Sequence, residues 1–91
     1  RPAERAALEE LLHWLQQQPE DISAEALQHE LYEIGKRHGF ANLRDWFKAL
    51  YEVLLGQSEG PRMGSFFALY GIDNSRRLVE AALAGRLPTA A

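Results

Sequence analysis

Residues that end helices are spread along this chain, and they constrain its fold more than any other feature. Pro19, Gly39, Gly56, Gly71 and Gly85 separate five segments in which apolar residues recur every three or four positions. Proline disfavours helical geometry in the residue before it, and glycine readily takes the left-handed conformation that ends helices. No segment alternates apolar and polar residues as a half-buried strand does. The sequence therefore predicts an all-α fold, a small bundle of about five helices.

Local signals also predict where the helices begin. Ser23 and Asn42 are suitable N-caps, because a side-chain oxygen there can accept a hydrogen bond from a free backbone N–H of the first turn. Asp73 or Asn74 is expected to cap the last helix in the same way. The third helix should form the centre of the core, because apolar residues cover most of its circumference. The predicted helices are residues 2–18, 24–38, 43–55, 65–70 and 74–84.

Charge divides the chain into two parts. Residues 1–39, with the first two predicted helices, carry four Lys/Arg and eight Asp/Glu, a net charge of −4. Residues 40–91 carry six Lys/Arg and five Asp/Glu, a net charge of +1. We expect the acidic part to face solvent or a neighbouring domain, and the three-helix part at 40–85 to hold any surface that meets phosphate groups. Residues 86–91 are expected to be a frayed tail.

Length and composition restrict the class of protein. The 91 residues suffice for one small domain with one core, and a start at Arg1 rather than at a methionine suggests a piece of a longer protein. No apolar run approaches the roughly 18 residues that cross a membrane, and no segment has the pattern of a signal peptide. We therefore expect a cytoplasmic protein with no membrane partner.

No group of residues has the spacing of a catalytic or metal site. The chain has no cysteine, and none of its histidines, His13, His29 and His38, lies four positions from another, as a helical zinc site requires. Ser58 and Ser65 lack the surrounding sequence of an activated serine nucleophile. We therefore expect no catalytic residue, no metal and no cofactor in this chain.

The glycine-rich loop at residues 56–64 allows two interpretations. Its glycines could let backbone N–H groups approach an anion in front of the following helix, with Arg62 contacting a phosphate. No Gly-Lys-Ser/Thr sequence closes the loop, so it is not a Walker loop. Alternatively, Pro61 and the glycines form a tight turn, and Gly64 lets two helices pack closely. The residues that define this loop motif are Gly56, Gly60, Pro61 and Gly64.

Aromatic and basic residues gather in the second half of the chain. Helical spacing places Trp46, Phe47 and Phe66 in the core, whereas Tyr70 ends a helix and could stack on an unpaired base. Arg44 and Lys48 lie one turn apart on one face. Arg76 and Arg77 are predicted to open the last helix, where positive charge opposes the helix dipole. A locally unfavourable residue of this kind can mark a functional surface.

Two stretches of this half resemble the C-terminal end of class I lysyl-tRNA synthetases. Residues 43–56 read LRDWFKALYEVLLG, and residues 60–71 read GPRMGSFFALYG. The related glutamyl-tRNA synthetases end in a looser version, a leucine-rich helix and a glycine followed by Gly-Pro and a further glycine. The resemblance covers about half of the chain.

The resemblance implies an α-helix-cage-like domain that contacts the anticodon region of a tRNA. The parent enzyme would activate lysine with ATP and attach it to lysine tRNA. The nucleotide-binding signatures of such enzymes are absent here, so this chain alone should not aminoacylate, and ATP would belong to the parent. The implied partners are tRNA, rather than DNA, and the remaining domains of the synthetase.

The candidate RNA contacts come from the chemistry and position of the residues, because no family motif assigns base reading in this stretch. Two other functions stay open: a helical domain that braces the synthetase or docks another protein, and the equivalent domain of a glutamyl-tRNA synthetase. The candidate tRNA-binding residues are Arg44, Lys48, Arg62, Tyr70, Arg76 and Arg77.

Overall fold

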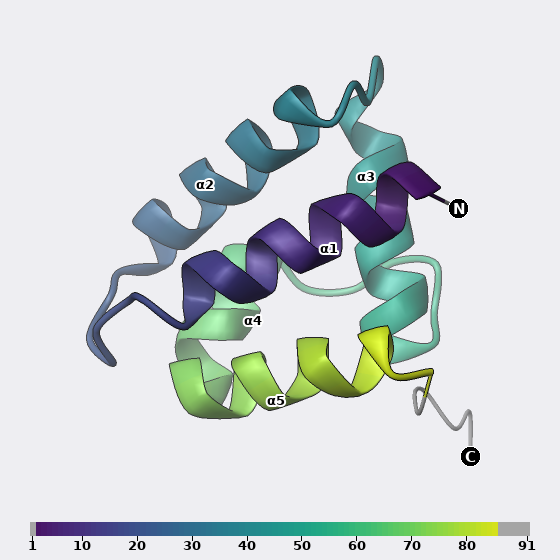
Figure 1. Ribbon diagram of the computed structural model, residues 1–91. Helices are drawn as coiled ribbons and strands as arrows, with labels where there is room; N and C mark the ends of the chain where they lie inside the picture. Colours follow the sequence, from purple (N-terminus) through teal and green to yellow (C-terminus); the bar gives the residue numbers. More distant parts are fainter. Residues whose placement is uncertain (1, 86–91) are drawn as a thin grey trace.

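The structure, a computed structural model, describes residues 2–85 and confirms the all-α prediction (Figure 1). The described part contains five α-helices and no strand, and its third helix continues into a π-helical turn, η1. The tail predicted at 86–91 lies outside the described residues. The elements are α1 (Pro2–Leu15), α2 (Ala24–Arg37), α3 (Leu43–Leu50), η1 (Tyr51–Leu55), α4 (Met63–Tyr70) and α5 (Ile72–Leu83).

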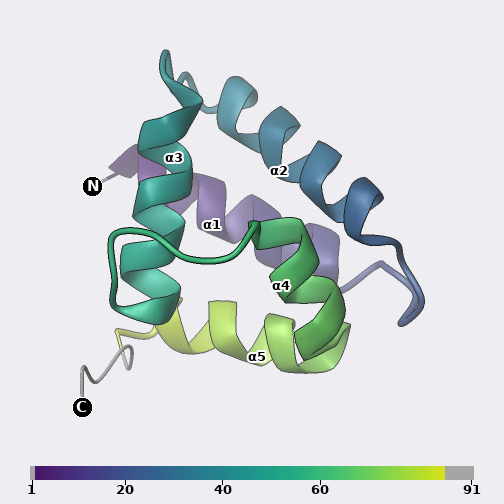
Figure 2. The same ribbon diagram turned by 180° about the vertical axis from the view of Figure 1, so that it is seen from behind.

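Helix α1 is flanked by α2 on one side and α5 on the other, and α3 stands across their ends (Figure 1). Helix α4 lies behind the end of α1 and packs against α2 and α5. Seen from behind, the loop after η1 crosses the outer face of α3 before it enters α4 (Figure 2). Near the two ends of the described chain, Arg5 Nη1 donates a hydrogen bond to the Leu83 carbonyl at 3.1 Å.

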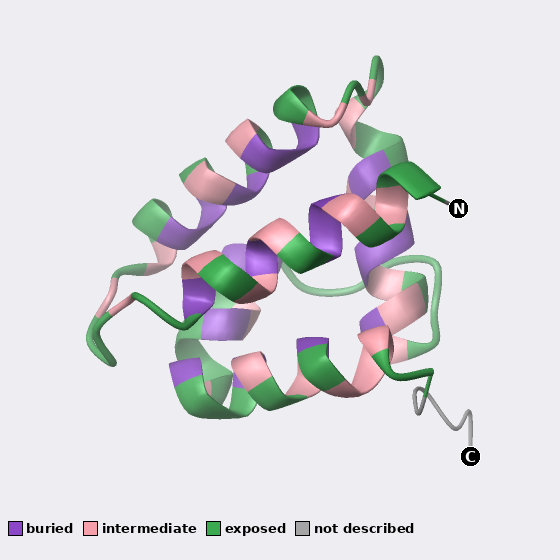
Figure 3. Cartoon of the chain, in the orientation of Figure 1, coloured by how far each residue is buried: buried purple, intermediate pink, exposed green. Residues whose placement is uncertain are grey.

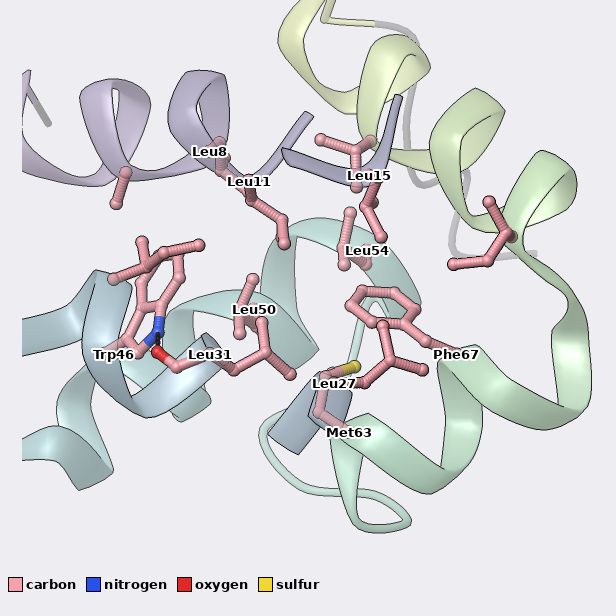
Figure 4. Packing of buried hydrophobic residues seen from close by; sticks show 14 residues of the cluster. Leu8, Leu11, Leu15, Leu27, Leu31, Trp46, Leu50, Leu54, Met63 and Phe67 are labelled. Atoms are coloured by element: carbon pink, nitrogen blue, oxygen red, sulfur yellow. Dashed lines mark hydrogen bonds between the residues drawn. The ribbon is translucent and has the colours of Figure 1, made fainter. Parts of the chain in front are cut away.

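The core lies between the inward faces of all the helices, where the buried residues gather (Figure 3). The predicted place of Trp46 in this core is confirmed, because its side chain is fully buried. Its Nε1–H donates to the Leu31 carbonyl of α2 at 2.9 Å, so the one polar atom of the indole is satisfied (Figure 4). Phe47 and Phe66 are only partly buried and pack at the edge. The largest fully buried side chains include Trp46, Phe67, Leu11, Leu15, Leu27, Leu31, Ile34, Leu50, Met63 and Val79.

Two predicted caps are present. The Ser23 hydroxyl accepts from the Ala26 N–H at 3.0 Å, and Asn42 Oδ1 accepts from the Arg44 N–H at 2.9 Å. Gly56 ends η1 in the left-handed conformation, with φ of 71°, as predicted for this position.

Several helix ends differ from the prediction. The first helix ends at Leu15, and residues 16–18 continue as tighter turns, in which the Gln17 N–H donates to the Trp14 carbonyl. The second helix ends at Arg37, one residue early, and the fourth begins at Met63, two residues early.

The third helix was predicted as one α-helix over residues 43–55, and its last five residues instead form a π turn. Trp46, Leu50 and Leu54 are all buried and lie four positions apart. In an α-helix each such step drifts by about 40° around the axis. The wider π turn reduces that drift, so Leu54 stays in line with the other two, which apolar spacing alone does not reveal.

The prediction for the last helix was also wrong at its start. It begins at Ile72, with Gly71 before it and no side-chain cap, so neither Asp73 nor Asn74 is the N-cap. Ile72 is buried, and this burial extends the helix two residues beyond the predicted start. The Asn74 side chain instead donates back to the Tyr70 carbonyl at 2.8 Å.

Candidate nucleic-acid interface

A pocket with a volume of about 420 Å³ lies between α3–η1 and the loop that crosses it. We call it the α3 pocket. One wall combines positive charge with aromatic rings, and the other is the polar loop. Its lining residues are Arg44, Phe47, Lys48, Tyr51, Ser58 and Glu59.

The packing of α3 explains why its two cations lie in the α3 pocket. Trp46 and Leu50 bury one face of the helix, which leaves Arg44 and Lys48 one turn apart on the exposed face. Within residues 2–85 neither side chain forms an ion pair or a side-chain hydrogen bond. Their charges are therefore available to an anion.

Most cations elsewhere in the described part are already paired. Arg5 pairs with Glu9 at 3.5 Å, Lys36 with Glu33 at 3.1 Å, and Arg76 with Asp73 at 3.5 Å. Arg37 contacts both Glu10 and Glu30. The unpaired positive charge of the described chain is thus concentrated in its second half.

The two aromatic rings of the α3 pocket are fixed by contacts, Tyr51 by the loop and Phe47 by α2. The Tyr51 hydroxyl donates to the Pro61 carbonyl at 2.7 Å, and Gly60 packs so closely over the ring that a Cβ there would lie 3.2 Å from Tyr51 Cδ1. The Phe47 ring meets Tyr32 of α2 edge-on, with centroids 5.2 Å apart. Burial, and secondarily Tyr32, raises the pKa of Tyr51, so its hydroxyl stays protonated and keeps donating.

The glycine loop is a turn whose end is anchored by packing. Gly64 is buried against α2, where an added Cβ would lie 2.6 Å from the Ala24 carbonyl oxygen. Its N–H donates to Gln28 Oε1 at 2.7 Å and is therefore not free to bind an anion. Arg62 lies exposed just before α4 and has no side-chain partner among residues 2–85.

The other candidates lie at the junction of α4 and α5. Tyr70 is 43% exposed and stacks on Phe66, with centroids 5.2 Å apart. Arg77 Nη1 donates to Asn74 Oδ1 at 3.1 Å. Because α5 begins at Ile72, both arginines lie in its second turn, so the prediction that they open the helix was wrong.

The structure thus places the six candidates in separate regions. Arg44 and Lys48 share the α3 pocket, whereas Tyr70 and the two arginines of α5 lie at the α4–α5 junction, toward the other side of the molecule (Figure 1). Phe47 and Tyr51 were not predicted as lining residues, and helical spacing had placed Phe47 in the core. Phe47 follows buried Trp46 by one position, about 100° around the helix, and that offset was the available signal.

Two kinds of feature are absent from residues 2–85. No group of three His, Cys, Asp or Glu side chains could hold a metal ion. No helix in this range has the length and apolar character needed to span a membrane.

Comparison with known proteins finds similarity to lysine–tRNA ligases. The chain is 49% identical over 79 residues to a lysine–tRNA ligase of Rickettsia bellii, 47% to that of Rickettsia rickettsii and 48% to that of Rickettsia felis. Each match covers 87% of this chain and 15% of the relative. The chain therefore spans about a seventh of the length of these curated relatives. No family model and no solved structure matches it.

Proposed function

We propose that this chain is the C-terminal tRNA-binding domain of a class I lysyl-tRNA synthetase and contacts the anticodon region of lysine tRNA. The similarity to lysine–tRNA ligases supports the parent enzyme. The stretches at 43–56 and 60–71, which resemble the C-terminal end of the class I enzymes, support the class and the place in the parent. The parent would use ATP to attach lysine to tRNA, in the cytoplasm, with its catalytic site in other domains.

The α3 pocket is the observation that carries the RNA-binding part of the proposal. RNA offers phosphate groups to cations, and its unpaired bases offer faces to aromatic rings. Arg44 and Lys48 supply two unpaired cations, and Phe47 and Tyr51 supply two partly buried rings beside them. An anticodon loop is single-stranded and presents both kinds of group.

The net charge of −3 is compatible with such local binding. In residues 2–39 the acidic surface neutralises its own cations, because Arg5, Lys36 and Arg37 all pair with carboxylates. Contact with RNA is therefore confined to a small surface, and the isolated chain should bind weakly. Two phosphate contacts on a single strand correspond to a slope of about −1.4 in a plot of log affinity against log salt concentration.

A bracing function is the second candidate, and the outer face of α4 favours it. Leu69 is 91% exposed and Tyr70 is 43% exposed next to it. Exposed apolar side chains that adjoin one another suit contact with another domain. Both functions can coexist, because α4 and the α3 pocket present different surfaces.

Titration of labelled lysine tRNA with this chain at low and moderate salt tests the proposal. We expect weak binding that falls with salt and with substitution of the anticodon, and that is lost in an Arg44→Ala, Lys48→Ala double variant. The matched control is Arg5→Ala, Lys36→Ala, which removes the same charge from paired positions. If the folded chain does not bind tRNA at low salt, or if both double variants bind equally, the proposed RNA contact is wrong.

A further inference from the structure

The two walls of the α3 pocket differ in the hydrogen bonds that they can form. The helical wall carries the cations Arg44 and Lys48, which only donate hydrogen bonds. The loop wall carries Glu59, whose carboxylate only accepts them, and Ser58, whose hydroxyl can do either. Phe47 and Tyr51 contribute apolar ring surface. A ligand that satisfies all of these groups needs a negative end, a flat apolar body and a hydrogen-bond donor.

The size of the pocket limits the ligand to one such unit. Pockets that hold drug-sized ligands start at about 300 Å³, so 420 Å³ is near the lower limit. A base pair within a duplex cannot expose its face to a partly buried ring, whereas an unstacked base of a loop can. One nucleotide, with its phosphate at one end and its base edge at the other, meets the requirements.

We infer that the α3 pocket holds a single unpaired RNA nucleotide and that Glu59 selects a base with an exocyclic amine over uracil. The inference rests on the proposed RNA binding and adds the chemical class that the pocket selects. The phosphate lies toward Arg44 and Lys48, because the carboxylate of Glu59 repels it from the loop wall.

The selection follows from the edges of the bases. Adenine, cytosine and guanine each carry an amino group that can donate to a carboxylate. Uracil carries carbonyl oxygens on both sides of its ring N–H, and these repel an ionised carboxylate. Glu59 forms no ion pair within residues 2–85, although it shares the pocket with two cations, so its oxygens are free to accept. Ser58 does not discriminate, because a hydroxyl adapts to donors and acceptors alike.

Nucleotide pairs that differ mainly at the amine provide the probes. Adenosine 5′-monophosphate is compared with purine riboside 5′-monophosphate, which lacks the amine but keeps the purine ring. Cytidine and uridine 5′-monophosphates form the pyrimidine pair. Binding to the 91-residue chain is followed by NMR from the shifts of backbone amides. We expect the largest shifts in α3 and in residues 57–60, and about three- to tenfold tighter binding of the member with the amine, the effect of one net hydrogen bond.

Two variants assign the preference to its residue. Glu59→Gln should abolish the preference within each pair, because an amide can donate as well as accept. Glu52→Gln is the matched control, since Glu52 is an exposed glutamate on η1 that does not line the pocket, and it should keep the preference. The Arg44→Ala, Lys48→Ala variant should weaken all four nucleotides alike.

Equal binding within both pairs, a preference that survives Glu59→Gln, or shifts confined to the α4–α5 junction would each overturn the inference. This failure is distinct from failure of the proposed function. Salt-sensitive tRNA binding that is lost in the Arg44→Ala, Lys48→Ala variant, without an amine preference, would support the proposed function and contradict base selection by Glu59. An amine preference without tRNA binding would support the pocket assignment and contradict the proposed function.

Discussion

Gly35 of α2 lies directly against the indole of Trp46: a Cβ on Gly35 would be 2.6 Å from Trp46 Cδ1 and 2.9 Å from Leu43 Cδ2. No real Cβ has contacts this short, and the indole is fully buried and fixed by its hydrogen bond to Leu31. The glycine thus sets how closely α2 and α3 approach.

Gly35→Ala should destabilise the protein, although alanine favours a helix over glycine by about 1 kcal/mol. The Cβ would force the indole away from α2, and overpacking of this kind costs about 1–3 kcal/mol. Urea denaturation followed by circular dichroism measures the change, and fluorescence of Trp46 should report its displacement. An unchanged or higher urea midpoint would contradict the close packing.

Gly64→Ala should be the more damaging substitution. Its Cβ would lie 2.6 Å from the Ala24 carbonyl oxygen and 2.7 Å from the Gln28 nitrogen, and these backbone atoms belong to a helix and cannot turn aside. We expect a loss of about 3 kcal/mol, the upper end of the usual cost of overpacking. Ser65→Ala, at the exposed next position, is the control and should change stability by less than about 0.5 kcal/mol. Similar losses in both variants would show that the close approach of Gly64 to α2 is not the cause of the destabilisation.

Acid should weaken the contact between α1 and α2. Arg37 chiefly, and then His38, lower the pKa of Glu10 below its ordinary value of 4.5 against the opposing effect of burial. A lowered pKa contributes stability that is present above pH 4.5 and is lost as the pH falls below it. Glu10→Gln should therefore lower the melting temperature at pH 7 and reduce its dependence on pH below 4.5.

Thermal melts between about pH 3 and 7 test the role of Glu10. Glu20→Gln serves as the control, because Glu20 is exposed in the α1–α2 loop. If the melting temperatures of the two variants and of the native protein fall in the same way as the pH is lowered, the Glu10–Arg37 contact does not contribute to stability.

The hydroxyl of Tyr51 should hold the loop in place rather than the whole fold. Tyr51→Phe removes the 2.7 Å hydrogen bond to the Pro61 carbonyl, which is worth about 1 kcal/mol, and leaves the ring in position. We expect faster hydrogen exchange at the backbone amides of residues 57–60 and of Arg62, and little change elsewhere. Uniformly faster exchange would mean that the contact supports the global fold instead.

Leu69→Ser separates bracing from folding. Leu69 is 91% exposed, so the substitution should change the stability of this chain by less than about 0.5 kcal/mol. If α4 contacts other domains of a synthetase, the same substitution in the full-length enzyme should lower its melting temperature. Ala68→Ser, also exposed on α4, is the control. A full-length enzyme that is unaffected by Leu69→Ser would exclude bracing through this residue.

Features that depend on neighbouring residues were predictable from the sequence. Ser23 and Asn42 cap helices because a side-chain oxygen reaches a backbone N–H within three positions, and the left-handed glycine at Gly56 is equally local. The start of α5 was missed because burial of Ile72 depends on the rest of the fold. Capping preferences, which depend only on nearby residues, favoured Asp73 or Asn74 as the N-cap instead.

The candidate site was predictable only in part, for the same reason. The spacing of Arg44 and Lys48 predicted that they share a face, and the structure agrees. Ser58 and Glu59 reach that face through the path of the loop, which is set by contacts of Tyr51 with Gly60 and Pro61. Such contacts between separate segments leave no periodic pattern in the sequence.

The π turn η1 lets the helix carry one residue more without changing the direction in which the following loop leaves. A π turn accommodates one residue more than the α-helical turn that it replaces. Deleting one residue within Tyr51–Leu55 would let the helix revert to α geometry, and the loop would still leave on the same side of α3. Among homologous chains, a single-residue deletion at this position would therefore be compatible with an intact α3 pocket wherever the lining side chains are retained.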